Sequence, residues 1–185
     1  MTEKIRHFID LDYFSKIDFR NLLNSCHQRK NSKTRNGKAE IDDDACAQDK
    51  ILAMIFEKPS TRTRFSFETA MYQLGGKSIV VNSIDMQLNR GETISDTAKV
   101  LSRYVDIVML RTNEHSSILD FSESSSVPVI NGLSDLSHPC QVVADLMTFE
   151  EILGPIESKV VTWFGPGNNM THSWIHAASL LDFEL

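Results

Sequence analysis

Apolar and polar positions in the middle of the chain alternate between fully apolar runs and one-sided helical patterns. Residues 51–56 are apolar without a break, which is typical of a strand buried on both faces of a parallel sheet. The apolar residues that follow recur at the helical spacing i, i+3, i+4 and i+7: Phe67, Ala70, Met71 and Leu74. Gly75 and Gly76 end this helix, and a second strand begins at Ile79. The order strand, loop, helix, strand predicts a right-handed parallel crossover.

The same pattern continues along the chain. Further strands are predicted at residues 105–110 and 127–130, and Pro128 places the latter toward a sheet edge or at the start of its strand. Helices are predicted from Asp18 (as N-cap), from Thr93 to about Tyr104, over residues 116–122, and from Val142 to Leu153. The pattern therefore predicts an α/β fold, with a parallel sheet flanked by helices.

Gly154 and Pro155 break the last of these helices, and a domain boundary is expected there. Residues 159–164 predict a new strand, residues 165–169 a tight glycine-containing loop, and residues 170–181 another amphipathic helix. We therefore expect one domain over residues 1–153 and the beginning of a second, Rossmann-like α/β domain over residues 154–185.

The junction between the first strand and its helix carries the clearest chemistry. Pro59 stiffens the loop, and Ser60 or Thr61 can cap the free amides of the first helical turn. Arg62 and Arg64 lie in the same turn, where their charge opposes the helix dipole and calls for a compensating anion. The pattern indicates an anion site, with phosphate as the expected ligand. An ordinary capped helix with two solvated arginines is the alternative.

Two further strand ends carry polar residues that bear on this site. Arg111 follows the predicted strand 105–110, and His138 and Gln141 precede the helix from Val142. Because ligands of open parallel sheets bind beyond the carboxyl ends of the strands, we expect these residues at the same edge as Ser60. A solvated arginine and a capping or packing histidine are the alternatives.

Composition narrows the class of protein without identifying it. The 185 residues are 41% apolar and 24% charged, with a net charge of -6, which argues against nucleic acid or an anionic membrane as a partner. No apolar run approaches the ~18 residues of a membrane span. The three cysteines, Cys26, Cys46 and Cys140, form no close metal-type pair and fit free thiols in a reducing cytoplasm. A cytoplasmic location is therefore expected.

Two long motifs resemble those of the transcarbamylase family. Residues 56–68, followed by Leu74-Gly75-Gly76, are similar to the carbamoyl phosphate loop of that family. His138-Pro139-Cys140-Gln141 resembles the ornithine carbamoyltransferase version of its second motif, and the aspartate enzymes usually have threonine in place of Cys140. The resemblance implies carbamoyl phosphate contacts from a set of eight residues: Ser60, Thr61, Arg62, Thr63, Gln87, Arg111, His138 and Gln141. It also implies an ornithine contact from Asn169, and a catalytic trimer in which the Gln87 loop lies near a subunit boundary.

The implied activity is transfer of the carbamoyl group of carbamoyl phosphate to L-ornithine, which gives citrulline and phosphate in arginine metabolism. Arg62, Thr63, Arg111 and His138 are the expected catalytic residues. The phosphate would be gripped as a leaving anion by Ser60, Thr61, Arg62, Thr63 and Arg111. Thr63, Arg111 and His138 would polarise the carbonyl oxygen. Gln141 would orient the carbamoyl amide, and the ornithine amine must arrive neutral. This chemistry requires no metal and no organic cofactor.

Pro166 stands where the family usually has an aspartate, which puts the geometry of the ornithine pocket in question. The resemblance also implies that the second domain continues for another ~100 residues. We therefore expect these 185 residues alone not to turn over ornithine.

Other interpretations remain open. An aspartate carbamoyltransferase is the nearest enzyme alternative, although Cys140 and residues 168–169 argue against it. A non-catalytic fragment that binds phosphate or a partner subunit is another. The loop at Gly165 resembles a dinucleotide fingerprint without its third glycine, which disfavours an oxidoreductase. Cys140 could be a nucleophile, but a small buried thiol is the favoured interpretation. Residues 42–44 could bind a metal, but a solvated loop is favoured there.

Overall fold

The computed structural model describes residues 5–33, 40–86 and 91–185. The chain forms two compact units. The first consists of Met1–Ile9 and Lys38–Ser134, and the second of Asp10–Gly37 and Asp135–Leu185. The domain boundary expected after residue 153 stays a prediction, because compactness alone does not define the domains of a family.

A four-stranded parallel sheet forms the centre of the first unit and confirms the predicted α/β fold. Its strands are β1 (Ile51–Phe56), β2 (Lys77–Asn82), β3 (Ile107–Arg111) and β4 (Val129–Leu133), in the order β2-β1-β3-β4. Strand β1 spans the predicted residues, whereas β3 and β4 each begin two residues later than predicted. Pro128 immediately precedes β4, which is the outermost strand of this order, as expected of a residue that cannot donate an amide.

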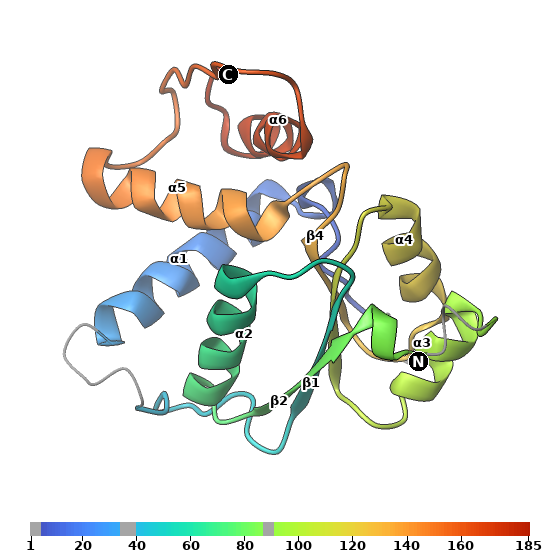
Figure 1. Ribbon diagram of the computed structural model, residues 1–185. Helices are drawn as coiled ribbons and strands as arrows, with labels where there is room; N and C mark the ends of the chain where they lie inside the picture. The colour runs from blue at the N-terminus through green and yellow to red at the C-terminus, as the bar shows by residue number, and fades with distance from the viewer. Residues whose placement is uncertain (1–4, 34–39, 87–90) are drawn as a thin grey trace. The chain divides into compact units, whose positions relative to one another are not determined.

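Helices cover both faces of this sheet (Figure 1). The helix α2 (Thr61–Gln73) packs on one face through Met71, which lies among Leu52, Met54 and Phe56 of β1. The helices α3 (Ile94–Leu101) and α4 (His115–Ser124) cover the other face, where Ala53 and Ile55 of β1 are buried. Successive side chains of a strand point to opposite faces, so a strand covered on both sides must be apolar at every position.

The turn between α2 and β2 depends on two glycines. Gly75 has a φ of +83°, in the left-handed region that favours glycine. At Gly76, an added Cβ would lie 2.9 Å from the carbonyl oxygen of Ala47 and 3.1 Å from that of Lys50. Backbone oxygens at that distance cannot move aside without a shift of the chain.

Replacement of Gly76 by alanine is therefore expected to destabilise the protein by about 1–3 kcal/mol, the usual cost of overpacking. Urea denaturation measures the effect. Gly167→Ala is the matched control, because a Cβ at Gly167 meets no atom within 4 Å. Equal midpoints for the two variants would show that the turn accommodates a side chain.

The second unit contains helices and a short 3-10 helix. These are η1 (Leu11–Tyr13), α1 (Lys16–Lys33), α5 (Pro139–Leu153) and α6 (Asn169–Leu181). Asp18 was predicted to cap α1, and this is wrong, because the helix already begins at Lys16. The hydroxyl of Ser15 accepts the amide of Asp18 at 3.1 Å and donates to the Asp18 carboxylate at 2.8 Å. A serine outside the helix thus binds a first-turn amide, and Asp18 lies inside the first turn.

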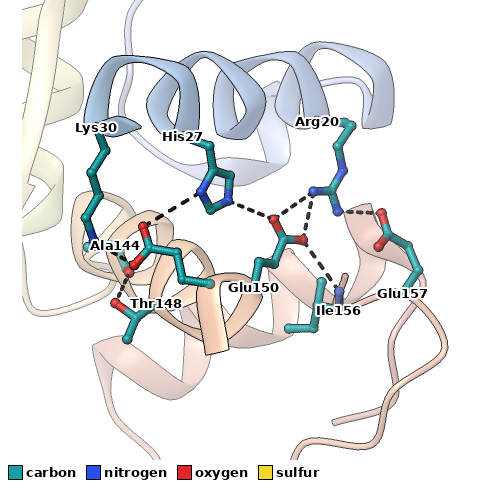
Figure 2. A network of polar contacts seen from close by, with 9 residues as sticks. Arg20, His27, Lys30, Ala144, Thr148, Glu150, Ile156 and Glu157 are labelled. Carbon is teal, nitrogen blue, oxygen red and sulfur yellow. Dashed lines mark hydrogen bonds and ion pairs between the residues drawn. The ribbon is translucent and has the colours of Figure 1, made fainter. Parts of the chain in front are cut away.

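A network of ionic contacts joins α1 to α5 (Figure 2). Nη1 of Arg20 donates to both carboxylate oxygens of Glu150, at 2.8 and 3.0 Å, and its Nη2 donates to Glu157. Nε2 of His27 lies 3.1 Å from Glu150 Oε2. The carboxylate of Glu150 is therefore held by two basic side chains from α1, which fixes the two helices against each other.

The strand predicted over residues 159–164 is wrong. Only Val160 makes a strand-like pairing, an isolated bridge to Glu184, and the side chains of Val160 and Phe164 are exposed. A β-strand is defined by backbone pairing, and an apolar run without a neighbouring strand adopts no ladder. In this chain the segment is held by hydrogen bonds to residues 182–184, including the amide of Val161 donating to the Glu184 carbonyl at 2.8 Å.

Within residues 5–33, 40–86 and 91–185, none of the helices has the length and apolar character that a membrane span requires. Cys26, Cys46 and Cys140 form no disulfide.

Candidate functional site

The amino end of α2 lies directly beyond the carboxyl end of β1. Ser60 occupies the N-cap position, with an extended backbone at φ −151° and ψ 105°. Its side chain makes no capping hydrogen bond, so the expected side-chain cap at this position is wrong. The first turn contains no acidic residue, whereas Arg62 and Arg64 are both exposed there. This helix end therefore keeps the positive dipole and adds positive side chains to it.

Arg111 lies at the same sheet edge, as the strand pattern predicted. It is the last residue of β3 and pairs in register with Phe56, the last residue of β1. Its Nη1 donates a 3.0 Å hydrogen bond to Oγ1 of Thr63, in the first turn of α2. The backbone carbonyl of Arg111 accepts the amide of Glu57 at 2.9 Å, which ties the end of β3 to the loop before α2.

The guanidinium of Arg111 lies in an environment that does not stabilise its charge. Burial lowers the pKa of Arg111, and the nearby positive charge of Arg62 lowers it further. Its Nε is buried and makes no hydrogen bond within the described residues. A buried donor without an acceptor costs about 1–3 kcal/mol, and an anion would remove that cost along with the repulsion from Arg62.

Two cavities lie at this edge. Ser60, Thr61 and Arg64 line an open one of about 460 Å³, together with residues of β1 and β2. Arg111 lines a separate cavity of about 40 Å³, beside Glu57 and other residues of the same edge. The hydrogen bond from Arg111 to Thr63 links the residues that line the small cavity to the first turn of α2, which lines the larger one. That the first-turn amides, Arg62 and Arg111 all surround one phosphate-sized space stays a prediction.

His138 and Gln141 belong to the second unit, at the amino end of α5. His138 is the N-cap residue, with Pro139 in the first turn, and its side chain makes no capping hydrogen bond. Its backbone amide donates to the hydroxyl of Ser173, a fully buried residue of α6, at 2.9 Å. Gln141 is exposed, and its amide nitrogen donates to Asp145 at 2.9 Å. Both residues thus lie at the amino end of a helix, and their expected position at the sheet edge of Ser60 stays a prediction.

Cys140 is the second residue of α5, and its side chain is partly buried. Burial raises the pKa of Cys140 to about 12, so the thiolate is not formed at neutral pH. Since the thiolate is the nucleophilic form, the structure supports Cys140 as a packing residue and argues against the nucleophile alternative.

Asn169 is the first residue of α6, and Asn168 before it caps the helix. The Asn168 side chain accepts the amides of Met170 and Thr171, at 2.9 and 3.2 Å, and the Thr171 hydroxyl accepts the backbone amide of Asn168, which completes a capping box. The carbonyl of Pro166 accepts the indole N–H of Trp163 at 3.2 Å. In the described chain no strand lies between α5 and this loop, so the oxidoreductase alternative lacks the strand that must come directly before a dinucleotide fingerprint.

Two sequence hypotheses concern loops. Gln87 lies outside the described residues, so its expected contact stays a prediction. Asp43 and Asp44 are exposed, as a solvated loop requires, and no metal-type cluster of the described residues includes them.

The structure also brings together three residues that the sequence analysis did not single out. Asp10, His172 and His176 place their ligand-type atoms within 4.8 Å of one another. The i, i+4 spacing of the two histidines on the predicted helix 170–181 was the available signal. Asp10 is distant in sequence, and no local pattern points to it.

Comparison with known proteins identifies the family of this chain. The family described as aspartate/ornithine carbamoyltransferase, carbamoyl-P binding domain, matches residues 6–151. The chain is 55% identical to the ornithine carbamoyltransferase of Caulobacter vibrioides over 180 residues, which is 97% of this chain and 58% of that protein. It is 49% identical to the Rhizobium meliloti ornithine carbamoyltransferase, with the same two coverages. The chain thus spans about 58% of the length of these curated relatives.

Solved structures of ornithine carbamoyltransferases have the same fold over the length of this chain. The ornithine carbamoyltransferase of Burkholderia thailandensis superposes with a TM-score of 0.87 at 47% identity, over 97% of this chain and 60% of that one. The Pyrococcus furiosus ornithine carbamoyltransferase gives a TM-score of 0.86 at 46% identity, over 95% of this chain and 55% of that one.

Proposed function

This chain belongs to the aspartate/ornithine carbamoyltransferase family, and on that premise we propose that it binds carbamoyl phosphate as part of an ornithine carbamoyltransferase. The activity would transfer the carbamoyl group to L-ornithine and release citrulline and phosphate, in arginine metabolism. Because the chain spans about 58% of its curated relatives, the activity of the whole enzyme is part of the proposal.

The observation that carries the proposal is the position of Arg111. Its guanidinium donates to Thr63 at the uncapped end of α2, and its buried Nε–H has no acceptor among the described residues. A phosphate oxygen is a suitable acceptor for such a donor. We assign the grip on the phosphate to Ser60, Thr61, Arg62, Thr63 and Arg111. Charged donors that hold a phosphate in place also stabilise it as it leaves with a growing negative charge.

The remaining roles rest on the sequence motifs. Thr63, Arg111 and His138 would polarise the carbonyl oxygen, Gln87 would contact carbamoyl phosphate and Gln141 would orient its amide. Asn169 would contact ornithine, whose side-chain amine attacks as the neutral form because a protonated amine has no lone pair. We favour ornithine over aspartate as the proposed acceptor for two reasons. Cys140 and residues 168–169 follow the ornithine pattern, and the relatives named above are ornithine carbamoyltransferases. A homotrimer or a multiple of one, and a cytoplasmic location, stay predictions.

Calorimetric titration of the protein with carbamoyl phosphate tests the binding step. We expect saturable binding, and we expect inorganic phosphate to compete with it, because both ligands present a phosphate group to Arg111. The absence of binding would contradict the proposal. A product assay with carbamoyl phosphate and either ornithine or aspartate then tests the acceptor, and carbamoyl aspartate in place of citrulline would assign the aspartate branch of the family.

A further inference from the structure

Three side chains of the second unit face one another, and none of them belongs to the proposed phosphate grip. His172 and His176 lie one turn apart on α6, with their ring centroids 4.5 Å apart. Asp10 is the N-cap of η1, which packs against α6. One carboxylate oxygen of Asp10 lies 3.1 Å from Nδ1 of His176, and the other lies 3.9 Å from Nδ1 of His172.

These separations suit a shared metal ion. Zn²⁺ binds imidazole nitrogen and carboxylate oxygen at 2.0–2.2 Å, so neighbouring ligands of a tetrahedral site are about 3.4 Å apart. The two distances from Asp10 lie on either side of that value, and all three ligand atoms lie within 4.8 Å of one another.

A simple Asp–His hydrogen bond explains only half of the arrangement. His176 is within hydrogen-bond distance of Asp10, which also accepts the amide of Leu11 at 2.7 Å. Nδ1 of His172, in contrast, is buried and makes no hydrogen bond within the described residues, although it faces the second oxygen of Asp10. A buried polar atom of this kind is costly unless something binds it. A cation between Asp10 and the two rings would satisfy both oxygens and both nitrogens.

We propose that Asp10, His172 and His176 form a binding site for a borderline transition-metal ion such as Zn²⁺. Two imidazoles and one carboxylate suit Zn²⁺, Co²⁺ or Ni²⁺, whereas Ca²⁺ and Mg²⁺ prefer oxygen ligands alone. The Asp10 side chain is only 6% exposed, but those of His172 and His176 are 37% and 23% exposed. Water therefore completes the coordination from the histidine side. The bound ion would join η1 to the first two turns of α6.

Titration of the protein with CoCl₂ and ZnCl₂ tests this site. Bound Co²⁺ should give the visible absorption of a tetrahedral site with nitrogen and oxygen ligands. It should lack the intense near-ultraviolet charge-transfer band that a cysteine ligand produces. This spectrum identifies the ligand type in the unaltered protein, so the test does not depend on the folding of a variant. A thiolate band, or no binding of either ion, would overturn the proposal.

Three variants locate the ligands. Asp10→Asn, His172→Gln and His176→Gln should each weaken Zn²⁺ binding by at least about tenfold, because loss of even an indirect supporting contact costs 10–100-fold. Asp10→Asn keeps an oxygen that can accept the amide of Leu11. Each variant should also lose the rise in melting temperature that ZnCl₂ gives the unaltered protein.

Cys46→Ser and His115→Asn are the controls, since they remove an exposed thiol and a histidine of the first unit. Both should bind Zn²⁺ as the unaltered protein does. Unchanged affinity in the three ligand variants, or weakened affinity in Cys46→Ser, would overturn the assignment.

Discussion

Replacement of Arg111 by glutamine is expected to weaken carbamoyl phosphate binding by roughly 30-fold or more. Removal of one member of a buried, hydrogen-bonded charge pair costs about 2–5 kcal/mol, and every 1.4 kcal/mol is a factor of ten. Arg111 meets the conditions for such a loss, because it is partly buried, donates to Thr63 and has a buried Nε–H that no described residue accepts. Calorimetric titration measures the change.

The same variant should leave the ligand-free protein at least as stable as before. Burial and the charge of Arg62 both lower the pKa of Arg111, so its positive charge is unfavourable in the ligand-free fold. The strand end is held by the Arg111 carbonyl, which glutamine retains. A structural arginine would behave in the opposite way, with a loss of stability and little change in binding.

Two further variants complete the test. Arg111→Lys keeps the charge but loses the planar fork of donors, and should recover only part of the affinity. Arg103→Gln removes an exposed arginine of the same unit and should bind carbamoyl phosphate normally. If Arg111→Gln binds as tightly as the unaltered protein, the guanidinium is not a ligand and the proposed grip on the phosphate is wrong.

Replacement of Glu150 by alanine is expected to destabilise the protein by about 3 kcal/mol. The Glu150 side chain is only 8% exposed and accepts two hydrogen bonds from Arg20 and one contact from His27 (Figure 2). Loss of one partner of a buried ion pair costs about 3–5 kcal/mol, because the other charge remains desolvated. We expect a loss at the low end of this range, because the side chain of Arg20 is 25% exposed and keeps its contact with Glu157.

Acid should remove this stabilisation. Burial alone would raise the pKa of Glu150, but hydrogen bonds from Arg20 and His27 outweigh it and hold the pKa below the ordinary value of 4.5. A folded-state pKa below the unfolded one means that the contribution is fully present above pH 4.5 and is lost as the pH falls through the lower value. The stability difference between the unaltered protein and Glu150→Gln should therefore shrink in acid.

Glu151→Ala is the matched control for this network. Glu151 is the next residue of α5. It forms an ion pair with Lys30, whose side chain is 58% exposed to solvent. Exposed pairs contribute about 0–1 kcal/mol, so this variant should unfold at nearly the same urea concentration as the unaltered protein. Equal losses for Glu150→Ala and Glu151→Ala would show that the burial of Glu150 has no energetic consequence.

The sequence alone was sufficient for the sheet and for the approach of Arg111 to the first turn of α2. The unbroken apolar run 51–56 predicted β1 because a strand covered on both faces has no solvent-facing side. The edge that brings Arg111 to Thr63 followed from the rule that the carboxyl ends of parallel strands meet. These features depend on local periodicity and on one topological rule, and both are visible in the amino-acid order.

Tertiary contacts decided the features that the sequence misplaced or missed. Residues 159–164 have the composition of a strand but form none, because a strand exists only through a paired neighbour. The start of α1 is the exception, since a local contact decided it: the hydroxyl of Ser15 accepts the amide of Asp18, and the helix begins at Lys16. Asp10 meets His172 and His176 across more than 160 positions of the chain. The pattern of residues determined which segments become helices and strands of the sheet, whereas the packing of distant segments decided which polar groups meet.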